Sequence, residues 1–271
     1  ASGAPTTYTG TDGVDLITLV NPGASVLQAE AGSDVINVSL AGQNGATVNT
    51  ASNQTLRGGQ GDDAFTITGG NLINSVIAGN LGNDTFIGSV IASTIQGGQG
   101  NDTVTLSSSN GGAFVNGNLG NDTLTAIAGA TYSSSSLLGG QGNDTITLGS
   151  GGAAVVAQGV RLEGSLGNDT ITINALQATS VGVTATGGAG NDVITAATAG
   201  IATGLYGGDG TDTLTSDASG SGTIAGGEGI DTLTVSNGGG GTTIDLTETS
   251  TPLRDAVQIE LAKVGTVGIT A

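Results

Sequence analysis

The chain has 271 residues, of which 52 are glycine, and it contains no His, Cys, Met or Trp. With only three Phe and three Tyr, a core of interlocking aromatic rings is excluded. The formal net charge of −18 disfavours nucleic acid and anionic membranes as partners and suits cations. Enzyme activity is also disfavoured, because the chain has no His, no Cys and no Ser beside a plausible base. No stretch approaches the roughly 18 apolar residues of a transmembrane helix, so membrane insertion is not expected.

A glycine-rich motif of six residues that ends in aspartate recurs along the chain. The first two copies, GTDGVD ending at Asp15 and AEAGSD ending at Asp34, are degenerate. The nine strong copies end at Asp63, Asp84, Asp102, Asp122, Asp144, Asp169, Asp192, Asp212 and Asp231. A drifting period of about 20 residues is typical of a solenoid.

Each repeat predicts two short strands. An apolar residue stands two positions after the aspartate, as Val104 does, and another stands two positions before the next glycine loop, as Val115 does. Alternation with a period of two is typical of a strand with one buried face. Stacked repeats would bury one another's apolar residues. The predicted fold is therefore an all-β, parallel β-roll or β-solenoid of about eleven turns, with one glycine loop per turn.

We expect a single solenoid domain over residues 1–241, with degenerate turns in 10–57 and strong repeats in 58–235. The remaining segment, 242–271, leaves the repeat and is expected to act as a cap, an assembly segment or a secretion segment.

The secondary structure of this last segment stays open. TPLRDAVQIELAK has the features of a helix with Pro252 near its start. Its residues Val257, Ile259 and Leu261 also alternate as they would in a strand.

Stacked aspartates need a counter-charge, and the sequence has no column of Lys or Arg. Neighbouring carboxylates about 5 Å apart repel by about 3 kcal/mol at an effective dielectric constant of about 20. A hard divalent cation held by carboxylate and carbonyl oxygens would compensate, and the lack of His and Cys favours Ca²⁺ over Zn²⁺ or Cu²⁺. We expect roughly eight to ten Ca²⁺ in one row, which would change the charge of −18 to between −2 and +2. The alternative is a metal-free ladder of Asp and Asn hydrogen bonds.

The segment GGQGNDTVT (97–105) resembles the RTX nonapeptide G-G-x-G-x-D-x-U-x, in which U is large and apolar. The resemblance is strong over residues 58–235 and weak over 10–57. It implies a parallel β-roll with Ca²⁺ between successive loops, a type I export machinery as partner, and a secreted, extracellular or cell-surface location. Ordinary rolls of this family have two nonapeptides per turn and metal on both edges. This chain has one loop per turn, so we expect calcium along one edge.

The resemblance also implies a set of metal ligands. They are the carboxylates of the eleven aspartates, from Asp15 to Asp231, together with loop oxygens. The loop positions are Gly58, Gln60, Gly79, Leu81, Gly97, Gln99, Gly117, Leu119, Gly139, Gln141, Gly164, Leu166, Gly187, Ala189, Gly207 and Asp209.

Two further patterns leave alternatives open. Thr-x-Thr pairs such as Thr145 and Thr147 resemble the flat face of β-solenoid ice-binding proteins, although Thr is common on any exposed strand. The threonine columns break at Ala64, Ile87 and Val193, and the loops lack the Thr of calcium-dependent antifreeze repeats. At the third loop position, leucines alternate with glutamines. This row indicates either a lateral contact with another chain or local packing.

The predicted function is that of a secreted, calcium-binding structural protein. We expect the chain to fold on Ca²⁺ and to self-assemble, with its own copies as partners, into an extracellular surface layer, filament or matrix. The alternatives are an ice-binding β-solenoid and a rigid spacer module of an adhesin.

Overall fold

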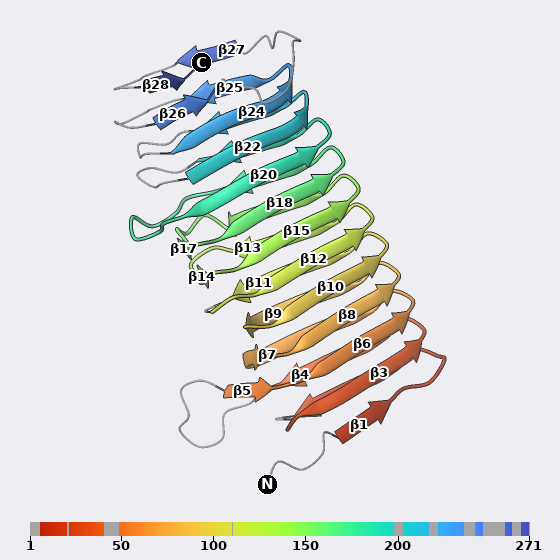
Figure 1. The fold of residues 1–271 in the computed structure, drawn as a ribbon. Coiled ribbons are helices and arrows are strands. Elements are labelled where there is room, and N and C mark those ends of the chain that lie inside the picture. The colour runs from red at the N-terminus through yellow and green to blue at the C-terminus, as the bar shows by residue number, and fades with distance from the viewer. Residues whose placement is uncertain are drawn as a thin grey trace.

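The structure, a computed structural model, describes residues 6–20, 22–40, 49–109, 111–197, 203–216, 222–235, 242–245, 258–261 and 267–270. In these residues the chain winds into a parallel β-solenoid, and the coils stack from the N-terminal to the C-terminal end (Figure 1). The predicted all-β solenoid of about eleven turns is confirmed. None of the described residues belongs to a helix that could cross a membrane.

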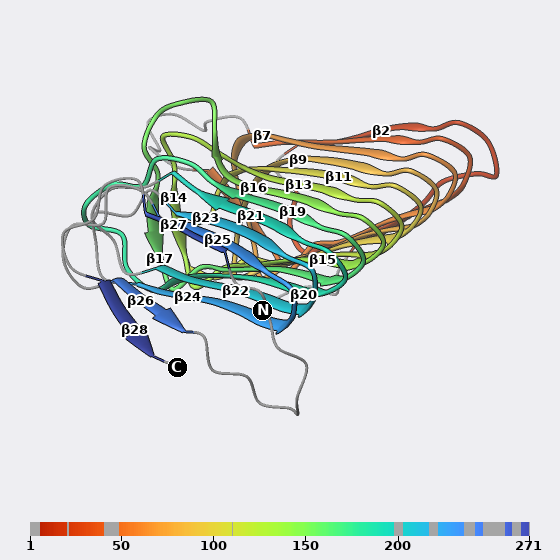
Figure 2. The same ribbon diagram turned by 90° about the horizontal axis from the view of Figure 1, so that it is seen from above.

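Each coil supplies one strand to each of two sheets, which face each other (Figure 2). The strands of the first sheet all end at one edge, where the glycine turns of successive coils stack (Figure 1). In stacking order this sheet contains β1 (Thr6–Thr9), β3 (Ser25–Ala31), β6 (Thr55–Gln60), β8 (Val76–Leu81), β10 (Thr94–Gln99), β12 (Phe114–Leu119), β15 (Ser136–Gln141), β18 (Arg161–Leu166), β20 (Val183–Ala189), β22 (Thr203–Gly210), β24 (Thr223–Gly229), β26 (Thr242–Asp245) and β28 (Val267–Thr270).

The second sheet begins immediately after each glycine turn. It contains β2 (Leu16–Val20), β4 (Val35–Ser39), β7 (Ala64–Ile73), β9 (Thr85–Ile91), β11 (Thr103–Ser108), β13 (Thr123–Ile127), β16 (Thr145–Ser150), β19 (Thr170–Ile173), β21 (Val193–Ala196), β23 (Thr213–Ser216), β25 (Thr232–Val235) and β27 (Gln258–Leu261), with β5 (Asn49–Ser52) paired to β7. A separate pair, β14 (Thr131–Ser133) and β17 (Val156–Gln158), is built from two longer connections.

The core is the narrow space between the sheets. Val104 and Leu106 of β11 are buried, whereas Thr103 and Thr105, which alternate with them, face outward. Val115 of β12 is buried from the opposite sheet. The two apolar columns expected from the sequence therefore meet in a single layer. Alternation places them there, because successive side chains of a strand point to opposite faces.

The edge opposite the glycine turns is lined by serine hydroxyls. Ser75 Oγ accepts a hydrogen bond from the Gln54 N–H at 3.0 Å, and Ser93 Oγ accepts one from the Ser75 N–H at 3.0 Å. In the same way, Ser135 Oγ accepts a hydrogen bond from the Ala113 N–H, and Ser180 Oγ accepts one from the Ala157 N–H. Neutral hydroxyls thus connect the coils at this edge, and the aspartate column lies at the other.

The three described strands after residue 241 continue the stack. β26 pairs with β24, β27 pairs with β25, and β28 pairs with β26. The helical alternative is therefore wrong for Gln258–Leu261, which form a strand. Pro252 and Val257 lie outside the described residues.

Candidate metal centre

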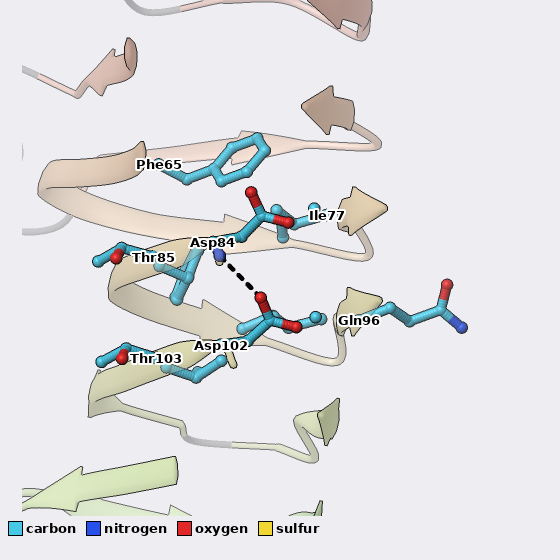
Figure 3. A pocket seen from close by; sticks show the side chains of 12 residues that line it. Phe65, Ile77, Asp84, Thr85, Gln96, Asp102 and Thr103 are labelled. Atoms are coloured by element: carbon cyan, nitrogen blue, oxygen red, sulfur yellow. Dashed lines mark hydrogen bonds between the residues drawn. The ribbon is translucent and has the colours of Figure 1, made fainter. Parts of the chain in front are cut away.

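The aspartate at the sixth motif position points into the solenoid and lies just inside the glycine turn. The ten aspartates from Asp34 to Asp231 are at most 5% exposed. Figure 3 shows Asp84 and Asp102 one above the other, while Thr85 and Thr103, next in the chain, stack on another side. Successive side chains at the start of a strand point to opposite faces. Because Thr103 points outward, Asp102 immediately before it points inward.

Backbone hydrogen bonds connect each aspartate to the next. The Asp84 N–H donates to Asp102 Oδ1 at 2.7 Å (Figure 3), and the Asp102 N–H donates to Asp122 Oδ1 at 2.7 Å. The series runs without interruption from Asp15 to Asp231. It uses one oxygen of each carboxylate.

A second ladder at the fifth motif position runs in the opposite direction. The Asn101 N–H donates to Asn83 Oδ1, and the Asn121 N–H donates to Asn101 Oδ1, both at 2.7 Å. The Asp and Asn hydrogen bonds offered as an alternative to metal are therefore present. They leave the other carboxylate oxygen unexplained.

The second carboxylate oxygen is buried and has no hydrogen-bond partner. This holds for Oδ2 of nine aspartates: Asp34, Asp63, Asp84, Asp102, Asp122, Asp144, Asp169, Asp192 and Asp212. A buried, unpaired charged oxygen is strongly unfavourable. The described arginines do not compensate, because Arg57 and Arg161 are exposed on the outer face of the first sheet and Arg161 pairs with Glu163. The row of oxygens is a chemical fit for cations.

Backbone oxygens complete the surroundings of each Oδ2. A Cβ built on Gly97, at the first motif position, would lie far inside contact distance of Asp102 Oδ2 and 2.7 Å from the Gly117 carbonyl oxygen of the next coil. In the pairing of β10 with β12, Gln96 pairs with Asn116 and Gly98 pairs with Asn118, but Gly97 and Gly117 do not pair. The first motif position is therefore displaced from the regular ladder of the sheet. The same overlap with the motif's own aspartate recurs at Gly58, Gly79, Gly117, Gly139, Gly164, Gly187, Gly207 and Gly226.

Oxygen alone forms this cradle. Among the described residues, no three acidic side chains gather in one place. A calcium ion at this site would therefore be held by Oδ2 of one coil and first-position carbonyl oxygens. Such hard oxygen donors are what Ca²⁺ prefers. A bound ion would supply the positive charge that the buried carboxylates lack.

The third motif position lies elsewhere. The Gln99 carbonyl accepts a hydrogen bond from the Gly82 N–H of the preceding coil at 2.9 Å. The narrow cavity beside Asp84 and Asp102 is lined by Gly79 and Gly97 and not by Leu81 or Gln99. The third-position carbonyls that bond to the preceding coil are those of Gln60, Leu81, Gln99, Leu119, Gln141, Leu166, Ala189 and Asp209. Of the predicted ligands, the structure brings together the first and sixth positions.

Burial raises the pKa of these carboxyl groups. It raises the pKa to about 7 for Asp63, Asp102, Asp169 and Asp212 and to about 6 for Asp84 and Asp144. Repulsion from neighbouring aspartates adds to the effect in most of them, and the backbone hydrogen bond opposes it. The pKa values of Asp122 and Asp192 are also raised by burial. Without a cation, a proton is the only way to neutralise these groups.

This predicts that the calcium-free protein loses stability as pH rises. The folded state binds protons more tightly than the unfolded state, whose aspartates have a pKa of 3.8. The free energy of unfolding therefore falls between about pH 4 and about pH 7. Urea unfolding in EGTA, followed by circular dichroism across this range, measures it. An increase in stability toward neutral pH would contradict the assignment.

The fold and this site define the class of protein: a parallel β-solenoid that stacks one acidic, oxygen-lined glycine turn per coil. A family model for the RTX calcium-binding nonapeptide repeat, in four copies, matches residues 74–90, 78–111, 133–152, 184–197 and 205–219. These segments thus match calcium-binding RTX repeats, and together with the parallel β-solenoid they support an RTX β-roll family.

A comparison with solved structures supports the fold. The crystal structure of a hyperactive, Ca²⁺-dependent, β-helical antifreeze protein from an Antarctic bacterium is similar, with a TM-score of 0.52 and 21% sequence identity. The match covers 88% of this chain and 85% of that one, and it shows a shared solenoid fold. No curated protein matches the sequence.

Proposed function

We propose that this chain is a secreted, non-catalytic structural protein that folds when calcium binds and then self-assembles outside the cell. The row of nine buried Oδ2 atoms without partners carries the proposal. A row of this kind is unfavourable where calcium is scarce and favourable where it is plentiful. Export in the unfolded state through type I machinery, followed by folding outside the cell, agrees with that dependence.

Self-assembly is supported by a strip along the glycine edge, formed by the third-position side chains of six coils. The strip consists of Gln60, Leu81, Gln99, Leu119, Gln141 and Leu166, which lie in register. Its leucines are 41%, 41% and 53% exposed. All six side chains are uncharged in a chain whose net charge is −18. A second copy approaches this strip without meeting like charge, and leucines at every second coil offer it apolar contacts.

Electron microscopy with and without chelator tests the proposal. Ordered filaments or sheets should form in calcium and disappear in EGTA. Changing Leu81, Leu119 and Leu166 together to Gln, the residue that the chain uses in alternate coils, should reduce assembly while circular dichroism still reports calcium-dependent folding. Dispersed monomers at high protein concentration in calcium would count against assembly.

A second candidate function, ice binding, rests on the outer face of the second sheet. Thr103, Thr123, Thr145 and Thr170 lie in one register column, and the column two residues further along each strand is also Thr in these four coils. Two parallel threonine rows on a regular sheet resemble an ice-binding face. Thermal hysteresis that is lost in Thr145→Tyr would favour this function over assembly.

A further inference from the structure

One coil differs from the others at the position that borders the metal cradle. The first motif position is glycine in ten of the eleven motifs and Ala29 in the motif that ends at Asp34. The register of β3 with β6 passes over Ala29 and Gly58 together, so the two residues are equivalent. Ala29 is fully buried.

Glycine at this position is required by space and not by backbone conformation. A Cβ on Gly58 would overlap with Asp63 Oδ2, yet Gly58 has no positive φ. The Ala29 backbone lies where the first-position backbone lies in the other coils. Its carbonyl oxygen is 2.5 Å from a Cβ built on Gly10 of the preceding coil, and the Gly117 carbonyl oxygen is likewise 2.7 Å from a Cβ built on Gly97. The Ala29 methyl group therefore takes the place that Oδ2 of the motif's own aspartate has in the other coils, so Asp34 cannot present its oxygen there.

The first coil differs in another way. Asp15 Oδ2 accepts a hydrogen bond from the Thr11 N–H at 2.6 Å, and the Thr11 hydroxyl also donates to this carboxylate. The carboxylate is thus satisfied by its own loop. By contrast, the eight motif aspartates from Asp63 to Asp212 each retain an unpaired Oδ2 next to a first-position glycine, whereas Asp34 retains an unpaired Oδ2 but has Ala29 at that position.

We infer that the calcium row begins at the Asp63 coil and that the two preceding coils form a metal-free N-terminal cap. Ala29 closes the cradle at Asp34, and Thr11 satisfies Asp15. The cap covers the first metal-binding coil and continues the aspartate ladder without adding ions. This inference rests on the calcium binding of the proposed function and assigns where that binding starts.

Native mass spectrometry of the full chain in saturating calcium tests it by counting bound ions. Asp34→Asn should leave the count unchanged, whereas the matched variant Asp102→Asn should lower it by at least one. Ala29→Gly should raise the count by one, and the Ala29→Gly/Asp34→Asn double variant should lose that gain. Circular dichroism confirms that each variant is folded.

Two results would overturn the inference: a lower count for Asp34→Asn in the wild-type background, or no gain for Ala29→Gly. Both leave calcium binding by the later coils intact. A wild-type chain that binds no calcium would instead defeat the proposed function and this inference together.

Discussion

Removing calcium with EGTA at about pH 8 is expected to unwind the solenoid. At this pH the aspartates whose pKa is raised to about 6 or 7 are ionised. Even about 1 kcal/mol for each unpaired buried oxygen adds up to about 8 kcal/mol over the eight positions from Asp63 to Asp212. A folded domain has about 5–15 kcal/mol of stability in total. The cost of leaving these oxygens unpaired is therefore large enough to cancel the stability of the fold.

Far-UV circular dichroism should show the loss of strand signal in EGTA and its return on adding excess calcium. Magnesium is the matched control. It requires shorter, octahedral coordination and gives up its water reluctantly, so it should restore much less structure. A chain that keeps its full strand signal in EGTA at about pH 8 would refute the view that cations hold the coils together.

Gly97→Ala is expected to destabilise the calcium-bound protein by about 1–3 kcal/mol, the usual cost of overpacking a tight site. The added methyl group meets Asp102 Oδ2 and the Gly117 carbonyl oxygen. Strand propensity alone predicts the opposite sign, because glycine weakens strands. The substitution therefore separates the two explanations, and one fewer bound calcium should accompany the loss of stability.

Gly23→Ala is the matched control for that substitution. No atom lies within 4 Å of a Cβ built on Gly23, and the residue has no positive φ. Thermal unfolding of both variants in calcium should show a lower midpoint for Gly97→Ala and little change for Gly23→Ala. Equal midpoints would mean that the space beside Gly97 is not needed for metal.

The sequence predicted the parts of this molecule that repeat. The column of Val104 and its equivalents and the outward threonines follow from the period-two pattern after each motif, and the stacked aspartates follow from the repeat itself. Because every coil presents the same pattern, its signal is reinforced many times. The sequence also predicted which edge carries the acids.

The sequence did not separate motif positions that look alike. Gly97 and Gly98 are adjacent glycines, yet a Cβ on Gly97 would meet the Asp102 carboxylate, whereas Gly98 has a φ of 129° and a Cβ on it would meet the Asn80 carbonyl oxygen. The expectation that the third-position carbonyls bind metal stays a prediction; each of them accepts a hydrogen bond from the preceding coil. Ala29 reads in the sequence as ordinary degeneracy. Its effect on the site is seen only in the structure, where a Cβ on the equivalent residue Gly58 would overlap with the Asp63 carboxylate.

The strand at Gln258–Leu261 illustrates another limit. Its alternation spans only four residues, and a short apolar pattern fits either a helix or a strand. Pairing with β25 decides the outcome. That contact joins residues outside the repeat to residues within it, so the repeat pattern alone does not predict it.

The opposed directions of the Asp and Asn ladders have a consequence for growth and evolution of the rod. From the coil of Asp63 to the coil of Asp212, each Asp N–H donates toward the successor and each fifth-position N–H donates toward the predecessor. Every joint between coils in this range therefore contains the same pair of bonds. Whole repeats can therefore be inserted or deleted in evolution without changing the contacts between coils. The length of the solenoid can vary while its cross-section stays constant.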